Sequence, residues 1–385
     1  MIIFGAQIIG ECTLYAARAA GIPIECFVDD RIKGHIAGVE IISTSHLRDR
    51  YPQASFYLTS PNIADMIEPL KCLGYEDWHS CGELLRGFDP SGIAFESRNG
   101  SNLQSVFSPE HIKYLIRTVL HHHENYLHPE RLTVQSVDLM ITERCSMKCR
   151  DCSNLMQYYE HPENAELAPM LAWINALCSR MDEVYEWRVI GGEPFMHKEL
   201  HTVVAHLCAI QNVRQVSIFT NATIMPREHQ WSAFEHEKVR FYITEYDQSR
   251  QLAPLQVALN ERGIAYVSER ANGWTDCASL KKHDRTREQN EALFAECCAK
   301  NLPTLADGRL YRCPFAANAA KLKAVPDYRS DYLNVLEVGR EDINSFLRDK
   351  RILETCDHCN GRSYGAAVIV PAVQTKQPLQ YVKWQ

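Results

Sequence analysis

Residues 136–152 of the 385-residue chain run SVDLMITERCSMKCRDC, an apolar stretch followed closely by three cysteines. The apolar residues at 136–142 predict a buried strand. Cys145, Cys149 and Cys152 then form a C-x3-C-x2-C loop directly after that strand. Three close thiolates can bind three corners of a cubane iron–sulfur cluster and leave the fourth iron open. A structural zinc site needs four ligands, and the neighbouring residues offer no obvious fourth.

The chain downstream of this loop alternates between apolar runs and stretches with helical spacing, such as residues 168–181. Repeated strand–helix units place their strands parallel, which predicts an α/β fold with a full or partial barrel. Ligands of such a fold bind at the C-terminal ends of the strands. The further strands are expected at 185–191, 213–220, 239–246 and 264–270.

A second motif, Gly191-Gly192-Glu193-Pro194, follows the second expected strand. The cysteine loop and this motif, in this order, resemble the radical S-adenosylmethionine (SAM) superfamily. The resemblance implies a partial (β/α)6 TIM-like barrel and a [4Fe-4S] cluster whose open iron binds SAM. The residues that match the family's SAM-contacting motif are Gly191, Gly192, Glu193 and Pro194.

Three further residues bear on the resemblance. Thr220 and Asn221 end the third expected strand and match the family's ribose-contacting position, although Asn after a strand is also a common turn former. Many members carry an aromatic residue immediately before the last cysteine of the loop, where this chain has Asp151. The adenine of SAM must therefore be contacted differently here.

The resemblance also implies a reaction. An electron from the reduced cluster splits SAM, and the resulting 5'-deoxyadenosyl radical abstracts a hydrogen from the substrate. The electron is supplied by an external donor such as flavodoxin or ferredoxin. Protein residues mainly bind, orient and shield, since the cofactor carries the difficult step. The sequence singles out no catalytic acid or base.

A second group of cysteines lies near the C-terminus, where residues 307–314 (DGRLYRCP) suggest a hairpin. Four thiolates could hold an iron–sulfur cluster or a zinc ion. Beside a radical SAM core, the group resembles the SPASM/twitch extension, and it implies the twitch type with one auxiliary cluster, expected to be [4Fe-4S] and to transfer electrons. Of the adjacent pair Cys297 and Cys298, the second is favoured. The expected ligands are Cys298, Cys313, Cys356 and Cys359.

The first thirty residues predict a βαβ unit with strands at 1–6 and 23–30. The segment Gly5-Ala-Gln-Ile-Ile-Gly10 partly matches a dinucleotide-binding fingerprint, and Asp29 and Asp30 follow about twenty residues on, where a ribose-binding acid is expected. The middle glycine is missing, and Gln7 would crowd a pyrophosphate. A structural or substrate-docking domain is therefore favoured over nucleotide binding. The region resembles Rossmann-like domains attached to sugar-tailoring enzymes.

The expected domains are a Rossmann-like domain at 1–100, a connecting helix and linker at 101–134, the barrel at 135–290 and the twitch-like domain at 291–385. A helix over 108–124 ends in His121-His122-His123. Adjacent histidines point in different directions on a helix, so we expect a solvated helix end and no metal site.

The amino-acid composition bears on whether the chain binds nucleic acid or a membrane. Lys and Arg total 41 against 48 Asp and Glu, and no segment concentrates the basic residues, so nucleic acid is not expected. No run of about 18 apolar residues is present, and the start lacks the features of a signal peptide, so we expect a cytoplasmic protein without a membrane anchor. The seven scattered cysteines are expected to be small buried apolar residues.

The sequence leaves three functions open. The favoured one is a radical SAM oxidoreductase or tailoring enzyme acting on a sugar, aminocyclitol or nucleotide-linked carbohydrate. The second modifies a ribosomally made peptide, although leader-binding domains of that class are usually winged-helix-like. The third is a zinc-bound scaffold without catalysis. Polar residues after the later strands that can line a substrate pocket, each also explicable as an ordinary loop residue, are Glu245, Tyr246, Asp247, Glu269, Trp274 and Asp276.

Overall fold

The computed structural model describes residues 1–96, 109–300, 302–349, 351–363 and 366–384. The chain divides into two compact units, Met1–Arg131 and Leu132–Gln385. The expected boundary near residue 100 lies outside the described residues. The helix expected as a connector is α5 (Pro109–Leu127), which belongs to the first unit. The core and the C-terminal cysteine segment, expected as two domains, share the second unit.

The first unit is built on a six-stranded sheet with the order β3-β4-β2-β1-β5-β6. All neighbouring strands pair in parallel except the edge strand β3, which is antiparallel to β4. Without β3, the strands follow the order 3-2-1-4-5 of a doubly wound nucleotide-binding fold. The strands are β1 (Ile2–Phe4), β2 (Cys26–Val28), β3 (Gly34–Ile36), β4 (Val39–Ile42), β5 (Phe56–Leu58) and β6 (Trp78–Ser80).

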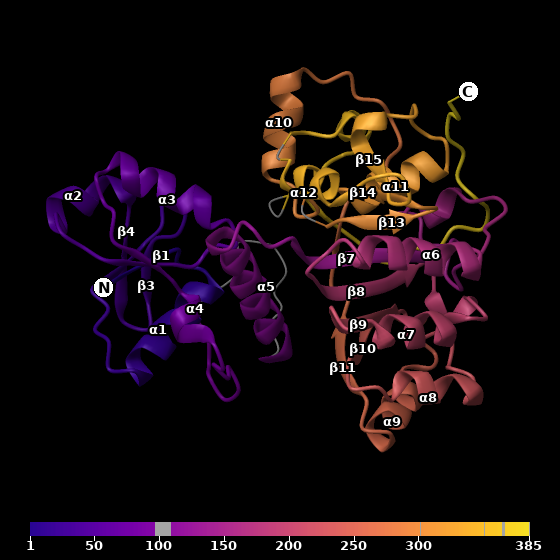
Figure 1. Ribbon diagram of the computed structural model, residues 1–385, viewed down its shortest axis with the longest axis horizontal. Helices are drawn as coiled ribbons and strands as arrows, with labels where there is room; N and C mark the ends of the chain where they lie inside the picture. Colours follow the sequence, from indigo (N-terminus) through magenta and orange to yellow (C-terminus); the bar gives the residue numbers. More distant parts are fainter. Residues whose placement is uncertain (97–108, 301, 350, 364–365, 385) are drawn as a thin grey trace. The chain divides into compact units, whose positions relative to one another are not determined.

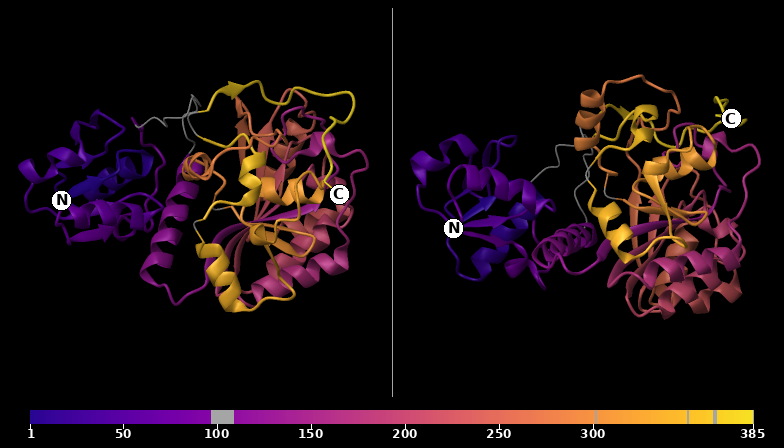
Figure 2. Two further views of the ribbon diagram at one scale, coloured as in Figure 1. Left: turned by 90° about the horizontal axis from the view of Figure 1, so that it is seen from above. Right: turned by 45° about the horizontal axis from the view of Figure 1, so that its top comes forward.

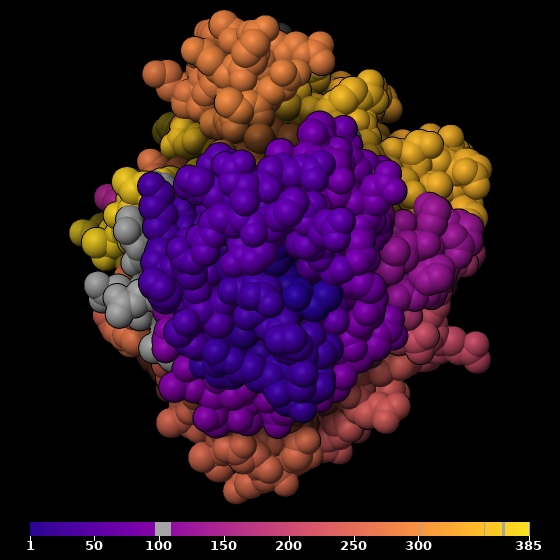
Figure 3. Space-filling model, turned by 90° about the vertical axis from the view of Figure 1, so that its left-hand side faces the viewer, coloured from indigo at the N-terminus to yellow at the C-terminus, as the bar shows by residue number. Residues whose placement is uncertain are grey.

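Helices connect these strands, and Figure 3 shows the surface of this unit in indigo and violet. Helix α1 follows β1, and helix α3 follows β5. Helix α5 packs on α1, α3 and α4. The helices of this unit besides α5 are α1 (Ile8–Ala19), α2 (Leu47–Arg50), α3 (Ile63–Cys72) and α4 (Gly82–Leu85).

The glycine-containing turn after β1 is held by contacts within the unit. An added Cβ at Gly10 would lie 2.0 Å from the carbonyl oxygen of Gly5, so this glycine allows α1 to approach the turn. Asp29 accepts a hydrogen bond from the backbone N–H of Ala6 at 3.0 Å through one carboxylate oxygen. Asp29, which stands where a complete fingerprint would place a ribose-binding acid, therefore ties the turn to the end of β2.

The three consecutive histidines correct one expectation. Helix α5 continues past them to Leu127, and His121 and His123 are buried in the first unit. His123 lies 2.7 Å from the hydroxyl of Ser80 and 2.8 Å from the carbonyl oxygen of Ser60. Burial lowers the pKa of His121 to about 3. The histidines do not form a solvated helix end, because the helix packs them against the strands.

The second unit contains an eight-stranded sheet with the order β11-β10-β9-β8-β7-β13-β14-β15 (Figures 1 and 2). Strands β7 to β11 are parallel and match all five strands expected from the sequence. The sixth parallel strand, β13, pairs with β7 at the other side of the run and does not follow β11. The five strands are β7 (Thr133–Thr142), β8 (Glu183–Gly191), β9 (Val213–Thr220), β10 (Val239–Glu245) and β11 (Ala265–Arg270).

Side chains alternate across this sheet. Val137, Leu139, Trp187 and Val189 point into the main hydrophobic core with the connecting helices, of which α6 and α7 lie side by side on one face (Figure 1). The intervening residues of the same strands are largely polar, and they occupy the opposite face. The helices are α6 (Leu167–Cys178), α7 (Leu200–Ala209), α8 (Trp231–Phe234) and α9 (Leu252–Glu261).

The C-terminal cysteine segment extends the same sheet through a hairpin of β13 and β14. Asp307 and Gly308 between them have φ values of 48° and 76°, the positive pair that a tight two-residue hairpin turn requires. The remaining elements are β12 (Trp274–Thr275), α10 (Arg287–Ala295), β13 (Thr304–Ala306), β14 (Arg309–Tyr311), α11 (Pro314–Lys321), β15 (Tyr332–Asn334), α12 (Arg340–Arg348) and β16 (Val368–Ile369).

Short 3-10 helices complete the described structure, namely η1 (Thr44–His46), η2 (Met156–Tyr158), η3 (Pro194–Met196), η4 (Glu228–Gln230), η5 (Arg329–Asp331) and η6 (Glu354–His358). Throughout the described ranges, every helix is either too short or too polar to cross a lipid bilayer.

Candidate cofactor site

The three cysteines of the C-x3-C-x2-C loop lie together at the C-terminal end of β7. Cys145, Cys149 and Cys152 pack with one another in a small cluster of side chains. Burial raises the pKa of the Cys149 thiol to about 11, and the nearby Cys152 raises it further, while a hydrogen bond from Gln374 lowers it. Burial also raises the pKa of the other two thiols. A bound metal reverses this preference, since a coordinating thiol is deprotonated outright.

The arrangement of donors distinguishes a single ion from a cluster. In the described part of the chain, no group of three or more His, Cys, Asp or Glu side chains is placed to hold one metal ion. All ligands of a zinc ion must meet at one point, about 2.3 Å from each sulfur. Thiolates of a cubane cluster each bind a different iron and therefore stand further apart. The three cysteines of the loop are the residues that would supply three such thiolates.

Two glycines bring the end of β8 against the cysteine loop. An added Cβ at Gly192 would lie 2.2 Å from the carbonyl oxygen of Arg144 and 2.8 Å from the Cβ of Cys145. An added Cβ at Gly191 would lie 2.3 Å from the carbonyl oxygen of Thr142. The backbone N–H of Glu193 donates to the carbonyl of Arg144 at 2.8 Å. The Gly-Gly pair is therefore required for the close contact between the two motifs.

Glu193 links the second motif to the third. Its side chain is completely buried, and its carboxylate accepts hydrogen bonds from the Thr220 hydroxyl at 2.8 Å and the Asn221 backbone N–H at 2.9 Å. It also accepts from the N–H of Phe195 at 3.3 Å, which caps η3 at the buried Pro194. Burial raises the pKa of Glu193 to about 7, although these hydrogen bonds oppose the shift. A cation bound nearby would favour the ionised form.

Asn221 closes the set of contacts between strand ends. Its side-chain N–H groups lie 3.7 Å from the sulfur of Cys145 and 3.4 Å from the hydroxyl of Ser146. The ends of β7, β8 and β9 thus meet at one place through residues of all three motifs. The structure brings together every residue that the sequence assigned to the first cluster and to SAM.

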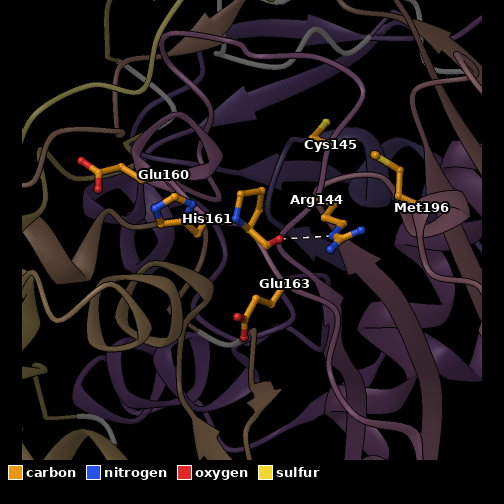
Figure 4. Close-up of a pocket in the computed structure, with 7 residues that line it drawn as sticks. Arg144, Cys145, Glu160, His161, Glu163 and Met196 are labelled. Atoms are coloured by element: carbon orange, nitrogen blue, oxygen red, sulfur yellow. Dashed lines mark hydrogen bonds between the residues drawn. The ribbon is translucent and has the colours of Figure 1, made fainter.

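A cavity of about 490 Å³ opens beside this meeting point (Figure 4). Arg144, immediately before the first cysteine, donates a hydrogen bond from Nε to the carbonyl oxygen of Pro162 at 3.1 Å and so fixes one wall. The cavity is wide open and offers both sulfur and charged groups. Its lining residues are Arg144, Cys145, Glu160, His161, Pro162, Glu163 and Met196.

The polar face of the sheet carries residues that the sequence analysis did not single out. Asp138 on β7 lies 3.3 Å from Nε of Arg188 on β8, and both side chains are largely buried. The guanidinium of Arg188 also stands 4.4 Å from the ring centre of Phe219. Tyr242 on β10 stacks on Phe219, with ring centres 4.8 Å apart. Burial raises the pKa of Asp138 to about 6, against the opposing effect of Arg188.

A signal for these residues was present in the sequence. Polar Asp138, Glu186, Arg188 and Ser217 occupy every second position of strands whose other positions are apolar. A strand buried by helices on one face and by a ligand site on the other produces this alternation. The alternation of polar and apolar residues along these strands is therefore the sequence signal for a polar face on this sheet.

The sequence offers six residues after the later strands as possible pocket residues, and two of them pack beside the cysteines of the loop. Tyr246 and Trp274 pack against the three cysteines, with their rings in an edge-to-face contact at 5.8 Å. The other four have other surroundings. Glu245 accepts from Ser268, Asp247 pairs with Arg270, Asp276 accepts from Asn360, and Glu269 is exposed.

The second cysteine group surrounds an enclosed apolar cavity. Cys313, Cys356 and Cys359 line it, as expected, but the fourth cysteine on the cavity is Cys297. Cys298 is exposed and does not line it. Sequence spacing does not separate two adjacent cysteines. In the structure, Cys297 pairs with Ser363 in an isolated antiparallel bridge and lines the cavity.

Backbone donors point at two of these sulfurs. The N–H of Ala316, in the first turn of α11, donates to the sulfur of Cys313 at 3.4 Å, and the N–H of Gly361 donates to that of Cys359 at 3.3 Å. Burial raises the pKa of Cys313 to about 11 and that of Cys359 to about 12. Four cysteines around one cavity, two of them with backbone hydrogen-bond donors at their sulfurs, suit a cysteine-ligated cluster, because such bonds help to set the potential of one.

Comparison with known proteins gives partial matches. No protein-family model matches the chain. Two GTP 3',8-cyclases of Stenotrophomonas maltophilia, from strains K279a and R551-3, are each 30% identical over 93 and 91 residues, which is 23% of this chain. The chain spans about a quarter of the length of these relatives, 27% in each case.

Among solved structures, BtrN in complex with AdoMet and 2-DOIA has a TM-score of 0.43 and 16% identity over 61% of this chain and 98% of that one. SuiB of Streptococcus suis bound to the precursor peptide SuiA has a TM-score of 0.33 and 11% identity over 74% of this chain and 78% of that one.

The cysteine loop after β7 and the Gly-Gly-Glu-Pro segment after β8 lie in contact with one another, and both match motifs of the radical SAM superfamily. These motifs and the partial match to the curated cyclases support a radical SAM enzyme.

Proposed function

We propose that the protein is a radical SAM enzyme that abstracts a hydrogen atom from a sugar-like small molecule. The observation that carries the proposal is the contact between Cys145 in the cysteine loop and Gly192 in the second motif. A [4Fe-4S] cluster bound there, together with SAM, supplies a 5'-deoxyadenosyl radical. The site is then a SAM pocket formed by the ends of neighbouring parallel strands, where ligands of such sheets bind.

The chain's own residues have definite tasks in this proposal. Cys145, Cys149 and Cys152 each give a thiolate to one iron, and the fourth iron stays open for SAM. Burial raises the pKa of Glu193 to about 7 and so favours its neutral form, but a cation bound nearby favours the ionised form, which would then offer a negative charge to the SAM ammonium. Asn221 holds the loop from the side of β9.

The polar face of the sheet is the proposed substrate surface. Asp138 and Arg188 offer hydrogen bonds to hydroxyl or amino groups, and the stacked rings of Phe219 and Tyr242 offer an apolar face. Polar groups around an aromatic platform suit a sugar or aminocyclitol better than an extended peptide, which needs backbone pairing along a strand edge. The doubly wound sheet of the first unit agrees with this preference, since a winged-helix leader binder is the expectation for peptide modification.

The four cysteines of the second group are proposed to hold one auxiliary cluster of the twitch type, with Cys297 in place of Cys298. A cluster with four cysteine ligands has no open iron for substrate, so its proposed role is electron transfer. The test is a pair of variants of neighbouring residues. Cys297→Ser should lose about half of the iron and sulfide bound per chain, whereas Cys298→Ser should keep both at wild-type content. The opposite pattern would favour Cys298 as the ligand, as the sequence predicted.

The reaction itself is tested by the formation of 5'-deoxyadenosine. The anaerobically reconstituted protein, given SAM and dithionite, should produce it, and Cys149→Ala should abolish it. Cys356→Ala should leave this uncoupled cleavage in place and impair turnover of substrate. Cys72→Ala, at an exposed cysteine of the first unit, serves as the matched control. Equal loss in the Cys149 and Cys356 variants would refute the separate roles of the two groups.

The substrate class is tested by measuring which compounds increase the formation of 5'-deoxyadenosine. Sugars, aminocyclitols and nucleotide-linked sugars are offered to the reconstituted protein, and the true class should raise 5'-deoxyadenosine formation above the uncoupled level. Substrate deuterium should then appear in 5'-deoxyadenosine. Stimulation by peptides alone would favour the peptide-modifying alternative.

A further inference from the structure

A segment near the C-terminus, residues 372–375, lies along the first cysteine loop. The backbone N–H of Arg150 donates to the carbonyl of Val373 at 2.7 Å, and the N–H of Thr375 donates to the carbonyl of Lys148 at 2.7 Å. Cys149 and Gln374 form an antiparallel bridge between these two bonds. A stretch more than 220 residues away in sequence thus pairs with the cysteine loop in the manner of a strand.

The apolar residue of this segment covers the loop. Ala372 is 5% exposed and packs against Met147 and Cys149. The segment is therefore attached to the loop by main-chain hydrogen bonds and by apolar contact.

The side chain of Gln374 is fixed by three polar partners. Its Oε1 accepts from the backbone N–H of Lys148 at 2.7 Å. Its Nε2 lies 2.7 Å from the carbonyl oxygen of Ala372 and 3.2 Å from the sulfur of Cys149. A backbone N–H can only donate and a carbonyl oxygen can only accept, so these two partners determine which end of the amide is which. The amide N–H therefore faces the sulfur.

This contact is shorter than the one made by the other side-chain amide at the loop. Nδ2 of Asn221 lies 3.7 Å from the sulfur of Cys145, against 3.2 Å for Gln374 and Cys149. Hydrogen bonds to ligand sulfurs and solvent exposure both act on the potential of an iron–sulfur cluster. A donor to sulfur stabilises the reduced, more electron-rich state and so raises the reduction potential.

We propose that Gln374 is a positioning residue of the first cluster: the C-terminal segment holds its amide against Cys149, where it raises the cluster's reduction potential and fixes the loop. The proposal rests on the proposed function only in that a cluster binds at the loop. It adds that a residue outside the superfamily's motifs, delivered by the far end of the chain, controls how readily the cluster accepts an electron.

The test separates attachment of the segment from the hydrogen bond to sulfur. Gln374→Glu keeps an oxygen that accepts from Lys148 and loses the N–H that faces Cys149. Gln374→Leu loses both. Gln377→Glu and Gln377→Leu are the matched controls, since Gln377 is exposed two residues beyond this segment, and the first introduces the same charge.

The first measurement uses the reconstituted full chain. The potential is followed by electron paramagnetic resonance, and the relevant cluster is identified by the change that added SAM produces in its signal. Both Gln374 variants should shift this potential to more negative values, while the second cluster and both Gln377 variants stay at wild-type potential. Unchanged potentials in both Gln374 variants would overturn the proposal.

The second measurement uses the same chain without iron. Amide hydrogen exchange at Lys148 should be faster by about fivefold in Gln374→Leu, because one hydrogen bond is lost, and near the wild-type rate in Gln374→Glu. Exchange at wild-type rates in Gln374→Leu would show that the side chain does not hold the loop. Failure to bind any cluster would instead count against the proposed function, so the two failures are distinguishable.

Discussion

At the scale of single residues, the site depends on how closely backbones approach. The Gly-Gly pair after β8 was predicted to serve the cofactor, and the structure adds a second reason for it. A side chain at Gly192 would occupy the position of the Arg144 carbonyl. Sequence identified the motif, but the contact with the cysteine loop depends on the pairing of β7 with β8 and was visible only in three dimensions.

Replacing Gly192 by alanine tests this contact. Gly192→Ala should lower the free energy of unfolding by about 1–3 kcal/mol and reduce the iron bound at the first site, because the cysteine loop must move to make room. Gly339→Ala is the control, since a Cβ there meets only Asp342 at 3.6 Å. Urea unfolding and iron analysis measure both effects, and equal results for the two variants would contradict the account.

The buried carboxylate of Glu193 makes stability depend on pH. Its pKa is raised from 4.5 to about 7 in the folded protein, so the protonated form is favoured by folding. The stabilisation is fully present below pH 4.5 and is lost as pH rises through about 7, on the order of 3 kcal/mol. Urea unfolding between pH 4.5 and 8 should show this fall in the metal-free protein, and Glu193→Gln should reduce it. A variant with the slope of the wild type would assign the effect to other groups.

At the scale of elements, the strands were the most predictable part. All five strands of the parallel run were expected, because each is a short run rich in β-branched and aromatic residues. Three features could not be predicted, since each depends on long-range pairing. They are the addition of β13 next to β7, the position of Cys297 and not Cys298 on the second cavity, and the return of residues 372–375 to the cysteine loop.

The hairpin of β13 and β14 gives a prediction at this scale. Gly308 has φ 76°, and a Cβ there would lie 2.9 Å from Nε1 of Trp173. Gly263 has φ 65°, and a Cβ there meets no atom within 4 Å. Both alanine variants pay the left-handed backbone cost of about 1–2 kcal/mol, and Gly308→Ala should cost more because of Trp173. Equal free energies of unfolding from urea titration would exclude the contact with Trp173 as a constraint.

At the scale of the whole molecule, the division into two compact units makes a thermodynamic prediction. Met1–Arg131 and Leu132–Gln385 have separate sheets, so calorimetry should resolve two unfolding transitions. Reconstitution with iron and sulfide should raise only the transition of the second unit, where all ligands lie, because a ligand that binds the folded state stabilises it. A single transition, or an equal rise in both, would contradict independent units.

In the first unit, the fold was more predictable from the sequence than the role of the partial dinucleotide-binding fingerprint. The βαβ opening of this unit predicted a Rossmann-like domain, and the structure shows a sheet with the doubly wound order. Gly10 and Asp29 make contacts within the unit. Composition cannot distinguish an acid that binds a ribose from one that holds a turn, because both stand at the end of the second strand.

The central claim is that three thiolates in the loop after β7 hold a cluster with one iron open to SAM. The most direct measurement is electron paramagnetic resonance of the reduced, reconstituted protein before and after addition of SAM. The account predicts that SAM changes the spectrum of one cluster in the wild type and that Cys149→Ala lacks this response. A loop that binds no iron, or a loop cluster whose spectrum is unaffected by SAM, would contradict it.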